Sequence, residues 1–238
     1  MQRGKLLYEG KAKSVYESEQ DGVLVIHYRN DTSALDGERI EQLDRKGAVN
    51  NQFNAFIMQH LEQAGVKTHF VEQLSADESL VKHLDMLPIE CVVRNYASGS
   101  ICRRLGVEDG LRLEKPTFEF FLKNDALHDP MINDYHIASF DWATEQEVAV
   151  MKEKTFEVNT ILSQLFADAG LILADFKLEF GRADGELLLG DEFSPDGCRI
   201  WDAETGKKLD KDRFRKSLGN VIEGYLEVAS RLGIAIEV

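Results

Sequence analysis

The most informative stretch of this 238-residue sequence is Leu173-Ala174-Asp175-Phe176-Lys177-Leu178-Glu179-Phe180-Gly181. Successive side chains of a β-strand point to opposite faces. The charged residues Asp175, Lys177 and Glu179 therefore share one face, and the apolar residues between them share the other. This alternation predicts a strand that turns one face to the hydrophobic core and the other to a chemical site.

A second strand should follow at once, over residues 186–193, and pair with the first as a hairpin. We expect a three-residue loop at 183–185, which would pair Arg182 with Glu186. The loop length matters because a shift of one residue moves every side chain of a strand to the other face.

In this register Lys177 lies opposite Asp191, and Glu179 and Asp191 lie diagonally on one face, close enough to share a hard cation. Mg²⁺ binds one or two carboxylates together with phosphate oxygens. The hairpin therefore predicts a magnesium site at Glu179 and Asp191. A two-residue turn would place Asp191 opposite Leu178, on the wrong face for this metal site. The alternative to a metal site is an exposed ladder of cross-strand ion pairs.

Long amphipathic helices are expected in the second half of the chain. Residues 144–147 form a capping box, and an apolar stripe at helical spacing runs from there to Gly170. A last helix is expected from about Lys211 to Leu232, ended by Gly233. Arg199 should lie on a short strand between these helices.

Strands dominate the first hundred residues. A series of short strands is expected over residues 5–30, and two more, at 80–87 and 89–93, flank a proline. Between them, residues 46–64 have the apolar spacing of a helix that Gly65 would end. Strands in front and helices behind predict an α+β fold with a cleft between its halves.

Composition excludes several classes of function. The chain has 28 Lys and Arg against 42 Asp and Glu, a formal charge of −14, which argues against a broad nucleic-acid surface. No apolar run approaches the ~20 residues of a membrane-spanning helix, and the N-terminus lacks a secretory signal, so we expect a cytoplasmic protein. Three cysteines without a C-x-x-C pair and six scattered histidines disfavour disulfides and a zinc site.

The first of two basic clusters lies in Gly10-Lys11-Ala12-Lys13-Ser14-Val15-Tyr16. Strand alternation would place Lys11, Lys13 and Val15 on one face, where a phosphate between the two ammonium groups would relieve their repulsion. Gly10 would let the backbone approach that anion. A solvated strand edge is the alternative.

The second basic cluster has Glu90 and Arg94 on one face of an apolar strand, followed by a short helix-like run that opens at Gly99-Ser100. Free N–H groups at a helix start beside an arginine make an anion site. The alternative is that Glu90 and Arg94 pair with each other and that Ser100 is only an N-cap. A polar loop at 123–130 is a further candidate substrate site.

These motifs closely resemble the SAICAR synthetase family, the phosphoribosylaminoimidazole-succinocarboxamide synthases of purine biosynthesis. The resemblance spans nearly the whole chain, and its most specific stretches are Pro88 to Ser100 and Asp175 to Gly181. One small departure is Ser98, where the family more often has alanine or threonine. The matching segments are 10–16, 31–36, 88–100, 123–130, 175–181 and 190–197.

The resemblance implies a two-lobed, ATP-grasp-like α+β fold with antiparallel sheets, flanking helices and ATP in the cleft between the lobes. We expect residues 1–86 to form a sheet-rich lobe that covers ATP, and residues 87–238 to form a lobe with the metal and ribonucleotide sites. The implied activity is that of an ATP-dependent ligase with Mg²⁺ as cofactor. It would join L-aspartate to carboxyaminoimidazole ribonucleotide (CAIR), giving SAICAR, ADP and phosphate, with an acyl phosphate as intermediate. The family also suggests a homo-oligomer.

Roles for individual residues follow from the same resemblance. Lys177 would face the reacting carboxylate, with Asp175 as a second catalytic residue. Metal ligands would be Glu179 and Asp191. The residues expected to bind ATP are Lys11, Lys13, Val15, Lys82 and Met86, and those expected to bind CAIR are Arg94, Ser100, Asp196 and Arg199. Candidates for binding aspartate, or for a substrate loop, are Asp36, Lys123, Asp129 and Arg215.

Two other functions fit part of the pattern. A kinase also needs lysines, a glycine turn and two metal carboxylates, but the sequence has no H-R-D or D-F-G triplet. A nucleotide-sensing protein would bind phosphate without paired carboxylates, so Glu179 and Asp191 favour an enzyme. Phosphate release that requires both CAIR and aspartate would identify the ligase.

Overall fold

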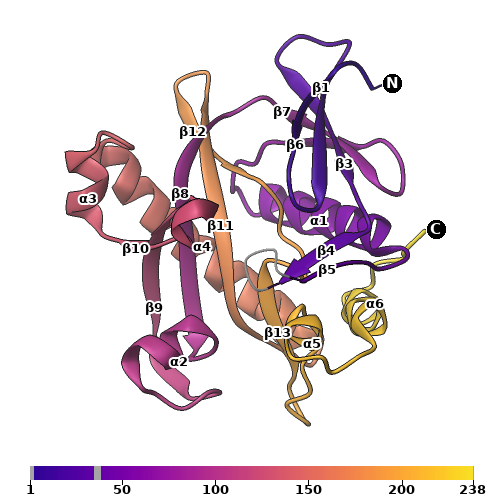
Figure 1. Cartoon of the computed structure of the whole chain (residues 1–238), viewed down its shortest axis with the longest axis vertical. Coiled ribbons are helices and arrows are strands. Elements are labelled where there is room, and N and C mark those ends of the chain that lie inside the picture. Colours follow the sequence, from indigo (N-terminus) through magenta and orange to yellow (C-terminus); the bar gives the residue numbers. More distant parts are fainter. Residues whose placement is uncertain (1–2, 35–38, 238) are drawn as a thin grey trace.

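Short strands at the start of the chain form a five-stranded antiparallel sheet in the order β1-β2-β3-β7-β6 (Figure 1). The computed structural model describes residues 3–34 and 39–237. The strands of this first sheet are β1 (Leu6–Glu9), β2 (Lys13–Glu17), β3 (Val23–Tyr28), β6 (Phe70–Gln73) and β7 (Glu78–Lys82). The strands expected over residues 5–30 are therefore confirmed.

The second sheet is built around β11, the strand that carries the alternating charges. Its order is β10-β9-β8-β11-β12, and β13 pairs with the other half of β11. These strands are β8 (Asp85–Tyr96), β9 (Arg112–Leu122), β10 (Met131–Ile132), β11 (Leu171–Ala183), β12 (Glu186–Gly190) and β13 (Cys198–Asp202); β4 (Asp31–Ala34) and β5 (Arg39–Gln42) form a separate pair. Phe176 and Leu178 lie in the main hydrophobic core, which confirms the predicted apolar face of β11.

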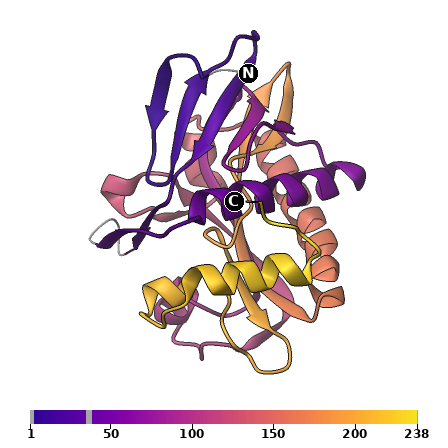
Figure 2. The same cartoon turned by 90° about the vertical axis from the view of Figure 1, so that its right-hand side faces the viewer.

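Two long helices cover the sheets and complete the expected α+β fold. The helix α1 (Lys46–Gln63) packs against β3, β6 and β7 of the first sheet, and α4 (Glu145–Asp168) packs against β8 and β11 of the second. Figure 2 shows α1 crossing beneath the first sheet. The shorter helices are α2 (Ser100–Leu105), the 3₁₀ turn η1 (Asp125–Leu127), α3 (Asp134–Ser139), α5 (Asp212–Arg215) and α6 (Val221–Arg231).

The predicted ends of the two long helices are confirmed. The Thr144 side chain accepts from the backbone N–H of Glu147, and the Glu147 carboxylate accepts from the backbone N–H of Thr144, which is a reciprocal capping box. Gly65 and Gly170 follow α1 and α4 with φ of 94° and 69°, a left-handed conformation that suits glycine.

The single helix expected over residues 211–232 is wrong. The chain forms α5, leaves helical geometry, and begins again as α6. Ser217, Gly219 and Asn220 adopt φ of 53°, 69° and 49°, which cannot continue a right-handed helix. Gly233, with φ of 77°, ends α6 as predicted.

The boundary between the strands around Pro88 also differs from the prediction. β7 ends at Lys82 within the first sheet, and β8 then runs unbroken from Asp85 to Tyr96 in the second. Pro88 lies where the register between β8 and β11 shifts, so its missing N–H does not break a regular ladder.

The predicted register of the β11–β12 hairpin is wrong. Ala183 pairs with Glu186, and the turn contains only two residues, Asp184 and Gly185, both with positive φ. Glu179 pairs with Gly190, where β12 ends, so the diagonal pairing used to predict the metal site does not exist. Asp191 instead follows the strand with a φ of 54°.

Candidate active site

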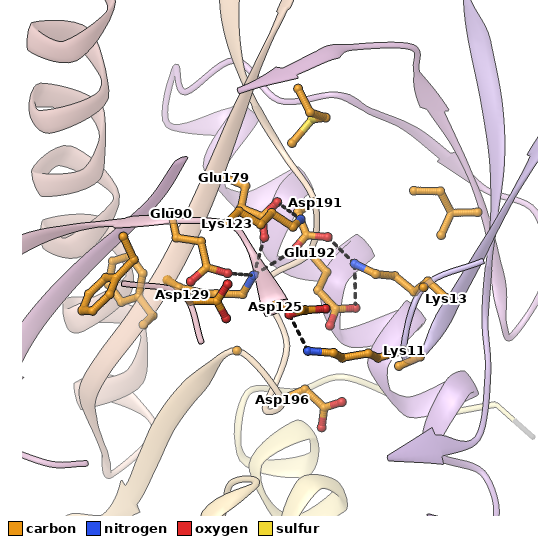
Figure 3. Close-up of a pocket in the computed structure, with 18 of the residues that line it drawn as sticks. Lys11, Lys13, Glu90, Lys123, Asp125, Asp129, Glu179, Asp191, Glu192 and Asp196 are labelled. Atoms are coloured by element: carbon orange, nitrogen blue, oxygen red, sulfur yellow. Dashed lines mark hydrogen bonds and ion pairs between the residues drawn. The ribbon is translucent and has the colours of Figure 1, made fainter. Parts of the chain in front are cut away.

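A cavity of about 840 Å³ lies between the two sheets. Its walls combine residues of β2, β3 and β7 from the first sheet with residues of β8 and β11 from the second. Figure 3 shows carboxylates and lysines from both sheets pointing toward one another in this cavity. The described site residues predicted from the sequence line it, so the fold brings together segments from both ends of the chain.

The ammonium group of Lys177 lies at the centre of three carboxylates. Its Nζ donates to Glu90 Oε1 at 3.1 Å, to Asp191 Oδ2 at 3.4 Å and to Glu179 Oε1. Burial alone would lower the pKa of Lys177, but the three carboxylates hold it well above its ordinary value. Glu90 therefore pairs with Lys177, and the alternative in which it pairs with Arg94 is wrong.

Asp191 reaches this cluster although the predicted register fails, because its positive φ redirects the chain after β12. It accepts from Lys13 as well as from Lys177. Burial would raise the pKa of Asp191, and these ammonium groups, with Lys123, hold it well below its ordinary value. Lys123 itself pairs with Glu179.

Lys11 and Lys13 do not share one strand face as the alternation pattern predicted. β2 begins at Lys13, so Lys11 lies in the turn before the strand. Lys11 Nζ contacts Asp125 Oδ1 at 2.6 Å, across the cavity mouth, whereas Lys13 pairs with Asp191 and lies 3.6 Å from Glu192 Oε2. Both lysines line the cavity and both already have protein carboxylates as partners.

At another part of the cavity, Asp175 holds two arginines. Its Oδ2 accepts from Arg94 Nη1 at 2.9 Å and from Arg199 Nη1 at 2.9 Å. Arg94 also donates to Glu119 Oε2 at 2.8 Å and to Ser100 Oγ at 3.3 Å. The carboxylate fixes two guanidinium groups beside the start of α2, as an oxyanion site requires.

Backbone geometry brings Arg199 to this position. Gly99 precedes α2 with φ of 69°, and a Cβ built there would lie 2.8 Å from Arg199 Cζ. Asp212 Oδ2 accepts from Arg199 Nε at 3.2 Å on the opposite side. Ser98, the residue that departs from the family pattern, donates from its hydroxyl to Asp109 Oδ1 at 2.6 Å, and its backbone carbonyl accepts from Arg94 Nη1 at 3.1 Å.

Asp196 anchors a further wall of the cavity. Its Oδ2 lies 2.6 Å from Lys46 Nζ, and its Oδ1 accepts from Tyr225 at 2.6 Å. The same Oδ2 lies 3.9 Å from Lys211 Nζ. Burial would raise the pKa of Asp196, but Lys211 and Lys46 hold it well below its ordinary value. Sequence reasoning missed both lysines, because each was placed only within an amphipathic helix.

An apolar part of the cavity lies near the passage from β7 to β8. Val15, Lys82 and Met86, all predicted ATP contacts, line it together with Leu24, Ile26, Val81 and Leu84. His69 also lines the cavity and was missed. Burial lowers the pKa of His69 to about 4, so its ring is neutral at neutral pH.

The remaining residues predicted to bind aspartate, or to form a substrate loop, differ in where they lie. Asp129 and Arg215 line the cavity, whereas Asp36 lies outside the described residues. Among the residues that the structure describes, no group of three or more His, Cys, Asp or Glu side chains has the geometry of a complete metal site. Glu179 and Asp191 together supply carboxylate oxygens around one cation, the Lys177 ammonium. Two carboxylates fit Mg²⁺ whose other ligands are phosphate oxygens and water.

Comparisons with known proteins agree along the whole chain. The family model described as SAICAR synthetase matches residues 6–232. A phosphoribosylaminoimidazole-succinocarboxamide synthase from Idiomarina loihiensis is 64% identical over 237 residues, which cover 100% of both proteins.

Solved structures give the same result. The crystal structure of phosphoribosylaminoimidazole-succinocarboxamide synthase from Ehrlichia chaffeensis has a TM-score of 0.95 and 43% identity, covering 98% of this chain and 100% of that one. A SAICAR synthetase in complex with ADP has a TM-score of 0.94 and 41% identity, covering 97% and 99%. These similarities extend over both sheets and the cavity between them.

Proposed function

This chain belongs to the SAICAR synthetase family, and from that membership we propose that it joins L-aspartate to CAIR at the expense of ATP, giving SAICAR, ADP and phosphate. It is an ATP-dependent carboxylate–amine ligase of purine biosynthesis. The observation that carries the assignment to this cavity is the cluster of Glu90, Glu179 and Asp191 around Lys177, with the arginine pair of Asp175 in the same cavity.

The reaction requires activation of a carboxylate, because an amine cannot expel oxide directly. The CAIR carboxylate attacks the γ-phosphoryl group of ATP, and the aspartate amine then displaces phosphate from the acyl phosphate. Several anionic groups meet in this sequence, so the site must supply positive charge that is already in place. Lys177 is fixed by three carboxylates and serves this purpose at the reacting carboxylate.

ATP binds between the sheets in this proposal. The apolar part of the cavity, with Val15, Lys82 and Met86, takes the nucleoside, and Lys11 and Lys13 bind the phosphates. To do so, both lysines exchange their present carboxylate partners for phosphate oxygens. The similarity to a SAICAR synthetase in complex with ADP supports nucleotide binding.

Glu179 and Asp191 are the residues that would hold Mg²⁺. When bound, Mg²⁺ supplies positive charge to the phosphate oxygens. These two carboxylates come from the end of one hairpin, where Lys123 pairs with Glu179 and Lys13 pairs with Asp191.

CAIR occupies the part of the cavity that contains the arginines. Arg94, Ser100 and Arg199 bind its phosphate, and Asp175 acts by orienting both guanidinium groups. Asp196 lies along the same wall as Arg199. In this proposal the CAIR carboxylate faces Lys177, which lines the same cavity.

Phosphate release tests the function directly. With ATP and Mg²⁺ present, the ligase should release phosphate only when both CAIR and L-aspartate are added. Release without aspartate would support a kinase or ATPase, and release without CAIR would exclude this ligase. Formation of SAICAR, followed by its absorbance, should match the phosphate released.

Four further expectations stay predictions: the boundary between lobes at residues 86 and 87, the bound Mg²⁺, the homo-oligomer and the cytoplasmic location. Within the described part of the chain, no helix is long and apolar enough to cross a membrane.

A further inference from the structure

Lys211 differs from the other lysines at the centre of the cavity. Lys11, Lys13, Lys123 and Lys177 each donate to a protein carboxylate. The nearest carboxylate oxygen to Lys211 Nζ, within residues 3–34 and 39–237, is Asp196 Oδ2 at 3.9 Å, too far for a hydrogen bond.

Asp196 compensates Lys211 only in part, because both of its carboxylate oxygens already have closer partners. Lys46 Nζ lies 2.6 Å from the same oxygen, and Tyr225 donates to the other. The Lys46 side chain is 1% exposed and that of Asp196 is 7%, so this pair forms a nearly buried, neutral unit in the cavity wall. The charge of Lys211, whose side chain is 15% exposed, is therefore compensated only at a distance.

Further positive charge lies beside Lys211. Arg215, one turn along, also lines the cavity, and its partner Asp212 is shared with Arg199 and with Lys216. Burial, Arg215 and Lys46 lower the pKa of Lys211 by more than Asp196 and Glu192 raise it, which is the expected sign for a buried ammonium without a hydrogen-bonded anion. A mostly buried cation of this kind is stabilised by a ligand of opposite charge.

The turn at residues 194–197 connects the backbone at Lys211 to the backbone at Lys177, and both residues line the cavity. The backbone N–H of Lys211 donates to Pro195 O at 3.1 Å, and that of Lys177 donates to Gly197 O at 3.1 Å. One short turn therefore contacts both lysines. An anion bound at Lys211 would therefore share the cavity with the carboxylate that is activated at Lys177.

We propose that Lys211, with Arg215 beside it, binds a carboxylate of the L-aspartate substrate. The inference rests on the proposed ligase function, which already assigns cations to the other two anionic substrates. ATP phosphates are assigned to lysines of the first sheet, and the CAIR phosphate to Arg94 and Arg199. The proposed function assigns no cation to the dicarboxylate amino acid, and Lys211 is a mostly buried cation with no carboxylate within hydrogen-bond distance among the described residues.

The test is the steady-state kinetics of Lys211→Met, which removes the charge and retains most of the side-chain length. The KM for L-aspartate should rise about 10- to 100-fold, the loss expected for one charge-assisted hydrogen bond, while the KM values for ATP and CAIR stay within about threefold. Lys211→Arg should restore most of the affinity for aspartate. Lys216→Met is the matched control, because Lys216 follows on the same segment and lies outside the cavity lining.

Three results would overturn the inference: an unchanged KM for aspartate, an equal rise for all three substrates, or a rise confined to CAIR or ATP. Wild-type protein that releases no phosphate in response to aspartate would instead overturn the ligase function itself. If Lys211→Met fails to fold, reductive methylation of lysines in the wild-type protein tests the same aspartate site. Aspartate should then protect Lys211 from methylation and leave Lys216 unprotected, and equal modification with and without aspartate would refute the site.

Discussion

Gly99 and Arg199 are in such close contact that a larger residue at position 99 would have to displace the arginine. A Cβ would lie 2.8 Å from Arg199 Cζ, and the φ of 69° is itself unfavourable for an L side chain. Gly99 thus holds open the position of an arginine assigned to the CAIR phosphate.

Gly99→Ala should therefore weaken CAIR binding by displacing Arg199. We expect the KM for CAIR to rise at least ~10-fold, the loss typical of one strong contact to a charged group, with little change for ATP. Gly106→Ala is the matched control, since Gly106 ends the same helix with φ of 67° and has nothing within 4 Å of its Cβ position. Equal effects of the two changes would attribute the loss to backbone strain alone.

Lys177→Ala should lower kcat by ~10²–10³-fold, because one fixed electrostatic stabiliser of the reacting groups is removed. The KM for ATP should change much less. Lys67→Ala provides the comparison, since Lys67 pairs with Glu186 at the exposed end of the β11–β12 hairpin. A tenth or more of wild-type activity in Lys177→Ala would contradict the catalytic role.

Asp191→Asn should raise the Mg²⁺ concentration needed for half-maximal activity. Loss of a residue that only supports a metal ligand costs ~10–100-fold in affinity, so loss of a ligand should cost at least ~10-fold. Asp184→Asn, in the exposed turn of the same hairpin, should leave the Mg²⁺ titration unchanged. A lower kcat with an unchanged Mg²⁺ midpoint would show that Asp191 only positions Lys13 and Lys177.

Lys46→Met should destabilise the fold by about 3–5 kcal/mol, because it leaves the buried carboxylate of Asp196 without its closest cation. Urea unfolding measures this change. Adding Asp196→Asn to Lys46→Met should recover part of the loss, since the double variant buries no unpaired charge. Lys67→Met, at an exposed pair, should change the unfolding free energy by less than ~1 kcal/mol.

The ion pair between Glu147 and Arg182 joins the start of α4 to β11 and should make stability depend on pH. The side-chain hydrogen bond from Arg182 lowers the pKa of Glu147 from 4.5 to about 2. The folded pKa lies below the unfolded one, so the stabilisation is present above pH 4.5 and is lost as the pH falls toward 2.

Glu147→Gln keeps the capping box and removes the charge. Its Tm should lie below that of the wild type at pH 7, and the two should converge between pH 4.5 and 2. A difference in Tm that is constant over this range would assign the effect to the cap rather than to the ion pair.

Much of this architecture follows from strand alternation and helix periodicity. The two faces of β11 and the capping box of α4 were predicted because both depend on residues close together in the sequence. The β11–β12 register was not, because Asp184 and Gly185 both accept positive φ and so allow a two-residue turn. Asp191 reaches the site because its φ is positive, and the identity of the residue does not predict that value.

The missed residues share a physical cause. Lys46 and Lys211 lie in amphipathic segments, where a lysine is ordinarily solvated, and only the tertiary fold buries them against Asp196. His69 lies between strands and belongs to no motif. Long-range contacts of this kind are set by the packing of whole elements rather than by local sequence.

Because several cavity lysines pair with protein carboxylates, the site without substrate is not a region of unbalanced positive charge. Lys11 holds Asp125, Lys13 holds Asp191 and Lys123 holds Glu179 before any substrate arrives. An anion that binds one of these three lysines replaces a carboxylate that is already in place, so its binding free energy is the difference between the two ion pairs. A ligand of the right charge but the wrong shape gains little binding free energy from such an exchange. In this way a chain with a net charge of −14 can still select among small anions.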